Sequence, residues 1–98
     1  MWIHLFAFRW LPDATEAQKD RATKEILAFQ GVIPGLLEVH FGKNQSSRAS
    51  EYESGGVMKF KDAEAFKNYI DHPAHRALVE WLPPLIEPVA VDLDVAPS

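Results

Sequence analysis

The chain has 98 residues, no cysteine and a formal net charge of −4 at pH 7. This length fits one hydrophobic core, so residues 1–98 are expected to form a single domain. Hydrophobic residues make up 47% and charged residues 24% of the sequence, which is ordinary globular composition and excludes disordered and fibrous classes. The lack of cysteine excludes disulfides, thiolate metal sites and thiol nucleophiles.

The charge pattern also limits the partners that can be expected. Lysine and arginine occur singly, without the basic stripe that binding to a phosphate backbone requires, so we expect no nucleic-acid partner. Residues 1–8 lack the cationic lead of a signal peptide, and no apolar run approaches the ~20 residues that cross a bilayer. We therefore expect no membrane association and a cytoplasmic location.

The first predicted element is a strand over residues 2–10. Its alternation places large side chains on one face, namely Trp2, His4, Phe6, Phe8 and Trp10. The other face carries Ile3, Leu5 and Ala7, so the strand is apolar on both sides. A strand of this kind needs cover on both faces.

A helix is predicted to follow, from the capping box Thr15-Glu16-Ala17-Gln18 to about Gln30. Its apolar face is defined by the helical spacing of Ala22, Ile26 and Phe29. Gly31 and the Pro34-Gly35 pair are typical of the end of a helix and predict its termination there.

Two strands are predicted next, over residues 36–41 and 52–60, with a polar connection between them. In the first strand the alternation assigns Leu37, Val39 and Phe41 to one face and Leu36, Glu38 and His40 to the other. His40 is therefore expected on the surface. The Gly55-Gly56 pair weakens the second strand and indicates either a bulge or a close approach of another group to the backbone.

The last third of the chain predicts a broken helix and a final strand. Asp62 is a suitable cap for a helix that turns Ala63, Phe66, Tyr69 and Ile70 toward the core. His72-Pro73 interrupts this helix, and proline is favourable as the first residue of a new one, which should run to about Trp81. Residues 89–95 alternate as a strand.

The order β-α-β-β-α-β predicts an α+β fold of the ferredoxin-like type, a four-stranded antiparallel sheet with both helices on one face. Helices then cover only one side of a sheet whose first strand is apolar on both. A second sheet must cover the other side, so we expect a homodimer in which two copies pack sheet to sheet as an eight-stranded α/β barrel.

The segment 69–75 carries the main candidate chemistry. His75 lies in the first turn of the restarted helix, where the helix dipole disfavours a protonated imidazole and keeps the side chain usable as a base. Tyr69 can donate its phenolic proton to a carbonyl oxygen and stabilise the enolate formed when that base removes a neighbouring C–H proton. This pair would suffice for carbonyl chemistry without a cofactor.

On this hypothesis each subunit has an apolar pocket between its helices and its sheet. His4 and His72 would orient the substrate, and the candidate wall residues are Phe6, Phe8, Phe29, Phe66 and Trp81. The substrate would be a small apolar or aromatic carbonyl compound. The expected reaction is one of three: aldol closure as in a polyketide cyclase, the reverse of that reaction as in a lyase, or isomerisation.

Other interpretations use the same residues. His72 can cap a helix while Tyr69 and His75 fill the helix–sheet junction of a non-catalytic dimer or small-molecule binder. A metal site at His72-x-x-His75 lacks a third ligand, and Pro73 distorts the face that would aim the two rings together, so no metal is expected. Neither a phosphate-binding glycine loop nor a nucleophile elbow is present in the sequence.

The sequence resembles the stress-responsive A/B barrel (Dabb) family over essentially its whole length. The match rests on residues 3–8, 60–66, 69–75 and 91–92, of which the Tyr-x-x-His-Pro-x-His signature is fairly specific. The resemblance implies a dimeric α/β barrel. In cofactor-free cyclases of the family the last histidine of the signature is the base and the tyrosine positions the carbonyl, which implies these roles for His75 and Tyr69, with His4 in the pocket.

The family is functionally mixed, and this chain departs from its cyclases. Ser54 stands where such a cyclase has a further histidine on its third strand, so the substrate does not carry over. Other members are stable stress proteins in which oligomerisation is the evident property. A cofactor-free monooxygenase on the related dimeric barrel is a third possibility, and it would require oxygen uptake with an electron-rich aromatic substrate.

Overall fold

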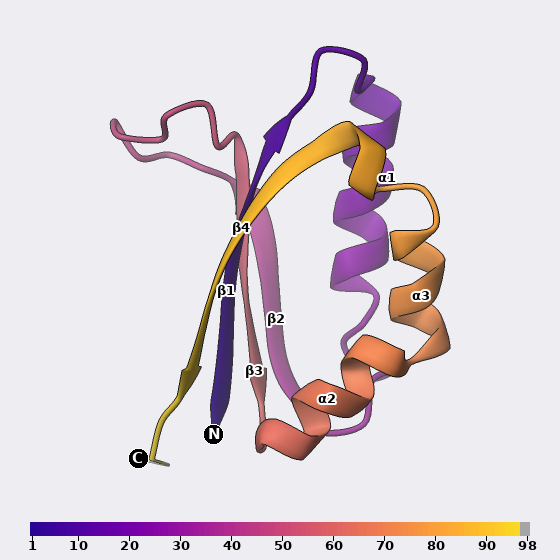
Figure 1. Cartoon of the computed structure of the whole chain (residues 1–98), viewed down its shortest axis with the longest axis vertical. Coiled ribbons are helices and arrows are strands. Elements are labelled where there is room, and N and C mark those ends of the chain that lie inside the picture. The colour runs from indigo at the N-terminus through magenta and orange to yellow at the C-terminus, as the bar shows by residue number, and fades with distance from the viewer. Residues whose placement is uncertain (97–98) are drawn as a thin grey trace.

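The computed structural model describes residues 1–96. The elements follow in the order β1 (Trp2–Trp10), α1 (Glu16–Leu27), β2 (Leu36–Lys43), β3 (Ser54–Phe60), α2 (Ala63–Asp71), α3 (Pro73–Val79), the 3-10 turn η1 (Pro83–Leu85) and β4 (Ile86–Asp94). The four strands form one antiparallel sheet in the order β2-β3-β1-β4. The helices lie on one face of this sheet (Figure 1), which confirms the predicted ferredoxin-like fold.

The alternation predicted for β1 determines where the core lies. On the helix side, Phe8 is buried and Trp2, Phe6 and Trp10 pack against the core. On the opposite side, no element within residues 1–96 covers the sheet (Figure 1). Four large apolar side chains are exposed along the two neighbouring strands β1 and β4, namely Leu5, Val89, Val91 and Leu93. The sheet therefore presents an uncovered apolar face.

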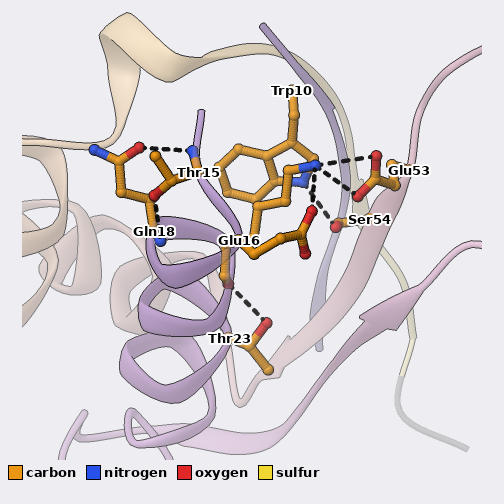
Figure 2. A network of polar contacts seen from close by, with 8 residues as sticks. Trp10, Thr15, Glu16, Gln18, Thr23, Glu53 and Ser54 are labelled. Atoms are coloured by element: carbon orange, nitrogen blue, oxygen red, sulfur yellow. Dashed lines mark hydrogen bonds and ion pairs between the residues drawn. The ribbon is translucent and has the colours of Figure 1, made fainter. Parts of the chain in front are cut away.

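The capping box predicted at the start of α1 is confirmed. The backbone N–H of Gln18 donates to the Thr15 hydroxyl at 3.1 Å, and the Thr15 N–H donates back to the Gln18 side chain at 2.9 Å (Figure 2). One turn later, the Lys19 ammonium donates to the Glu53 carboxylate at 3.1 Å, just before β3 begins. These contacts fix α1 at one end of the sheet.

The side-chain alternation predicted for β2 is wrong at its first residues. Leu36 is buried at 7% exposure, whereas Leu37 is 53% exposed. The strand register shifts between Leu36 and Glu38, and such a bulge moves the following side chains to the opposite face. At the free edge of β2, the Gln30 side chain accepts from the Val39 N–H at 3.2 Å and donates to the Leu37 carbonyl at 3.4 Å.

The predicted apolar face of α2 is confirmed at Phe66 and Tyr69 and is wrong at Ala63 and Ile70. Ala63 is exposed and Ile70 is 41% exposed, whereas Ala65 and Tyr69 are buried. Aromatic packing accounts for the rotation, because an α2 turned toward Ile70 would expose the large Tyr69 ring. That ring lies 5.5, 5.2 and 6.1 Å, between centroids, from Phe29, Phe60 and Phe66.

The Gly55-Gly56 pair of β3 marks a close approach and not a bulge. The pairing of both glycines with β1 is regular. A Cβ atom on Gly56 would lie 2.5 Å from the His40 carbonyl oxygen and 2.6 Å from the Phe6 ring. The groups that approach this glycine are therefore the neighbouring strand β2 and an aromatic side chain of β1.

Candidate active site

A cavity of about 190 Å³ lies between the sheet and the segment that runs from α3 through η1. Its polar lining consists of His4, Tyr69 and His75. The remaining side chains of the lining are apolar: Phe6, Phe8, Ile26, Leu78, Val79, Leu82, Pro83, Ile86, Pro88, Val89 and Ala90. Five of the predicted site residues thus meet at one pocket: His4, Tyr69 and His75, with Phe6 and Phe8 as wall residues.

His75 enters this pocket because the helix restarts at Pro73. Its ring nitrogen Nδ1 lies 3.0 Å from the Ile70 carbonyl oxygen. A carbonyl oxygen only accepts, so Nδ1 carries the hydrogen and Nε2 of the neutral ring keeps a free lone pair. Burial lowers the pKa of His75 below its ordinary value of 6.5; the hydrogen bond to Ile70 opposes this shift, and a protonated His4 would add to it. Burial therefore favours the neutral imidazole, the form predicted from the sequence.

Tyr69 supplies a proton donor beside this base. Its ring centroid lies 4.5 Å from that of His75. The residue is only 5% exposed, and burial raises the pKa of the phenol above its ordinary value of 10.0. Within residues 1–96 the hydroxyl forms no hydrogen bond, and it is not among the polar atoms sealed from solvent without a partner. Its proton is therefore available to a ligand in the pocket.

His4 is held by a carboxylate from the far end of the chain. β1 pairs with β4 so that His4 lies directly opposite Asp92, and the His4 Nδ1 is 2.7 Å from the Asp92 Oδ1. The same oxygen accepts from the Trp2 indole at 3.1 Å. Since an ionised carboxylate only accepts, the His4 Nδ1 donates, and its Nε2 stays free in the neutral ring. Sequence reasoning missed Asp92, although pairing of the first and last strands in the predicted fold was the signal that could have found it.

Four of the predicted site residues are placed away from the pocket lining. His72 is the N-cap of α3, where its Nδ1 accepts the Ala74 N–H at 3.1 Å, as the structural interpretation of that residue requires. Phe29 and Phe66 pack in or against the core around Tyr69, behind the pocket. Trp81 turns toward α1, where its indole donates to Glu25 at 3.2 Å. Of the predicted wall residues, Phe6 and Phe8 line the pocket.

Two further polar residues also lie outside the pocket. His40 is exposed on β2, as predicted. The Ser54 hydroxyl accepts from the Trp10 indole at 2.9 Å at the start of β3 (Figure 2), so it is engaged in the structure of the sheet. In the part of the chain that the structure describes, no group of three or more histidine and carboxylate side chains converges as a metal site.

The arrangement combines an unprotonated imidazole and a protonated phenol at one wall of an apolar pocket. A neutral imidazole can accept a proton at ordinary pH, and a buried phenol can donate a hydrogen bond to an oxygen that becomes negatively charged. The apolar surroundings strengthen that hydrogen bond, because they keep the local dielectric low. None of the helices described for residues 1–96 has the length and apolar character needed to cross a membrane.

Comparison with known proteins gives relatives over most of the chain. Olivetolic acid cyclase from Cannabis sativa is 31% identical over 74 residues, which cover 74% of this chain and 73% of that protein. A dimeric ferredoxin-like protein of unknown function from Thermobifida fusca is 27% identical, with a TM-score of 0.84, covering 96% of this chain and 90% of its own.

Hydroxynitrile lyase from Passiflora edulis has the same fold, with a TM-score of 0.86 and 16% identity, covering 99% of this chain and 94% of its own. The model of the Stress Responsive A/B Barrel Domain matches residues 3–95, which includes the Tyr69 to His75 signature, His4 and Asp92. The chain therefore belongs to the stress-responsive A/B barrel domain family.

Proposed function

We propose that this protein is a cofactor-independent enzyme that removes a proton from a carbon next to a carbonyl group in a small, apolar compound. The observation that carries the proposal is the pairing of His75 and Tyr69, whose rings lie 4.5 Å apart in the pocket. One has a free lone pair and the other an unengaged hydroxyl. The 31% identity with olivetolic acid cyclase supports this reaction class.

The proposed reaction begins with proton transfer to His75. Its Nε2 takes the proton from the substrate carbon, the C–H electron pair becomes a C=C bond, and the carbonyl oxygen acquires the negative charge. The Tyr69 hydroxyl donates a hydrogen bond to that oxygen. In an aldol closure the enolate attacks a second carbonyl carbon, forming a C–C bond, while the π pair of that carbonyl moves to its oxygen, which takes the proton back from His75. In an isomerisation His75 instead returns the proton to another carbon of the enolate.

His4 has a positioning role in this proposal. Asp92 holds the Nδ1–H of His4 at 2.7 Å and thereby fixes the plane of the ring and its tautomer. The other ring nitrogen is then free to contact a second oxygen of the substrate. Stacking of the ring on Phe6, at 5.1 Å between centroids, restricts its rotation further.

Exchange of α-protons for deuterium tests the proposal without knowledge of the natural substrate. In D₂O, the protein should catalyse loss of the α-proton NMR signal from small methyl ketones. A positioned base contributes about 10²- to 10⁴-fold, so His75→Gln should slow exchange by that factor. His40→Gln, which changes an exposed histidine outside the pocket, is the matched control and should exchange like wild type. An unchanged rate in His75→Gln would remove the mechanism.

A second candidate function is binding of a small apolar molecule without turnover. The largely apolar lining of the pocket favours it, since such surfaces bind hydrocarbon groups whether or not a reaction follows. On this alternative the wild-type protein binds ketones but does not exchange their α-protons.

We also propose that two copies associate through the uncovered face of the sheet to form an α/β barrel. The exposed Leu5, Val91 and Leu93 supply an apolar surface that association would bury. The related protein from Thermobifida fusca is dimeric. Location in the cytoplasm stays a prediction.

A further inference from the structure

We infer that the pocket selects an uncharged ligand of about one aromatic ring with a short substituent, and that it rejects both carboxylates and two-ring compounds. This inference rests on the proposed function, because it names the class of substrate that the same site would accept. It depends on the volume of the cavity, on the chemistry of its lining and on the burial of its floor.

The volume sets the size limit. A cavity of about 150 Å³ lined by aliphatic and aromatic side chains in another protein holds one benzene molecule. The pocket of this chain measures about 190 Å³. It therefore has room for one ring and a few further atoms, such as an acetyl group, whereas a two-ring compound that carries the same acetyl group exceeds the space.

The floor of the pocket is rigid enough to enforce that limit. Ile26, Leu78, Leu82 and Ile86 are all buried, from 1 to 9% exposed, and belong to the core. Close-packed side chains of this kind do not yield to an added ring without strain. The rim, formed by Val79 and by residues 88–90, is exposed. A ligand would enter between α3 and β4 and place its hydrocarbon part against the floor.

The lining excludes a negative charge. Among the described residues that line the pocket none is Lys, Arg, Asp or Glu, so a bound carboxylate would meet no permanent cation, and the only titratable nitrogen groups there are the imidazoles of His4 and His75. Burial lowers the pKa of His75, so this ring is not a cation at neutral pH. The carboxylate of Asp92, which is hydrogen-bonded to the lining residue His4, would repel a second anion. Burying an unpaired charge is unfavourable, so uncharged ligands are preferred.

A binding series separates size from charge. Acetophenone and benzamide are uncharged one-ring probes, benzoate has a similar size with a negative charge, and 2-acetylnaphthalene is an uncharged two-ring ketone. By calorimetric titration of the wild-type protein, the first two should bind at least about tenfold more tightly than the last two. Equal affinity for benzoate would overturn the charge argument, and equal affinity for 2-acetylnaphthalene the size argument. If neither acetophenone nor benzamide binds at millimolar concentration, the inference as a whole is wrong.

A pair of variants tests whether the ligand binds in this pocket. Ala90 lies on β4 opposite Phe6 and lines the pocket, so Ala90→Leu fills part of the cavity and should weaken acetophenone binding at least about tenfold. Ala77→Leu makes the same change on an exposed position of α3 outside the lining and should bind acetophenone like wild type. Wild-type affinity in a folded Ala90→Leu protein would show that the ligand lies elsewhere.

Failure of this inference and failure of the proposed function are distinguishable. Loss of discrimination in the binding series, with α-proton exchange still dependent on His75, would refute the ligand class and leave the reaction. Discrimination in the binding series with no exchange by the wild-type protein would refute the reaction and leave the ligand class.

Discussion

Replacing Gly56 with alanine should destabilise the fold more than the same replacement at either of the other glycines of β2 and β3, Gly42 and Gly55. The added Cβ would lie 2.5 Å from the His40 carbonyl oxygen, 2.6 Å from the Phe6 ring and 3.0 Å from the Phe41 ring. Real Cβ atoms do not tolerate the first two separations, and the first involves backbone of the adjacent strand. Relief therefore requires both a movement of β2 away from β3 and a shift of the Phe6 ring.

The expected cost follows from overpacking of a filled core, about 1–3 kcal/mol. For a domain of this size, 1 kcal/mol corresponds to a fall of about 4–8 °C in Tm. Phe6 also lines the pocket, so a shift of its ring should weaken acetophenone binding as well. Urea and thermal unfolding at one fixed protein concentration would measure the loss, since association of subunits makes stability depend on concentration.

Two glycines nearby provide graded controls. At Gly42 an added Cβ meets nothing within 4 Å, and at Gly55 the nearest atom is 3.4 Å away. Gly42→Ala should therefore be neutral or slightly stabilising, because alanine reduces the freedom of the unfolded chain, and Gly55→Ala should fall between the two. A Gly56→Ala protein within about 0.5 kcal/mol of Gly42→Ala would refute the close approach on which this reasoning depends.

The remaining predictions concern the site and the uncovered face. Exchange activity should persist below pH 6.5, because burial lowers the pKa of His75 and the base must be unprotonated; an acid limb at or above pH 6.5 in the pH–rate profile would contradict this. The unfolded chain protonates His75 more readily than the folded chain does. The contribution of His75 to the free energy of unfolding is therefore complete above pH 6.5 and is lost as pH falls through its lowered pKa, which urea unfolding at a series of pH values below 6.5 would measure. Tyr69→Phe should slow exchange by about 10²- to 10³-fold. Because burial raises the pKa of Tyr69, its phenol stays protonated at about pH 11, so the variant and the wild-type protein should show the same phenolate absorbance at that pH. Asp92→Asn should change the tautomer of His4, as observed in imidazole nitrogen NMR spectra, while the melting temperature changes little. An unaltered His4 spectrum would show that Asp92 does not set the tautomer of His4. Leu5→Glu should convert a dimer to monomers in sedimentation experiments, whereas the same change at the exposed Val32, away from the sheet face, should not.

The parts of the fold that the sequence predicts well are set by local signals. The capping box at Thr15 and the His72-Pro73 break act within a few residues, and each is found where it was expected. The strict alternation of residues 2–10 likewise fixes which face of β1 enters the core. With six elements in a known order, antiparallel pairing and helix placement then follow from general rules of chain topology.

Errors occur where two neighbouring residues are equally apolar. Leu36 and Leu37 both suit a buried position, and the choice between them depends on a register shift against β3 that no local pattern records. On α2, Ile70 and Tyr69 compete for the core in the same way. The ring of Tyr69 wins because three aromatic residues distant in sequence surround it, and that cluster forms only in the folded chain.

The candidate site also has a part that local sequence predicts and a part that depends on long-range packing. Tyr69 and His75 come from one short segment, so their proximity could be predicted from spacing, and the structure places their rings together. The wall could not be predicted in this way, because its floor is formed by aliphatic side chains that carry no distinctive chemistry and come from separate parts of the chain, namely Ile26, Leu78, Leu82 and Ile86. Aromatic residues, which the sequence favoured for that role, largely serve the core behind it.

β4 connects the completion of the fold with the completion of the site. It is the last element of the chain and an edge strand of the sheet, and it pairs with β1 along its whole length. It contributes Asp92, which lies 88 residues from its partner His4, together with the rim at residues 88–90. Neither the orientation of His4 nor the β4 side of the pocket exists until this strand has docked. The base and the phenol are therefore local features of the chain, whereas the geometry that would make them selective is a property of the complete sheet.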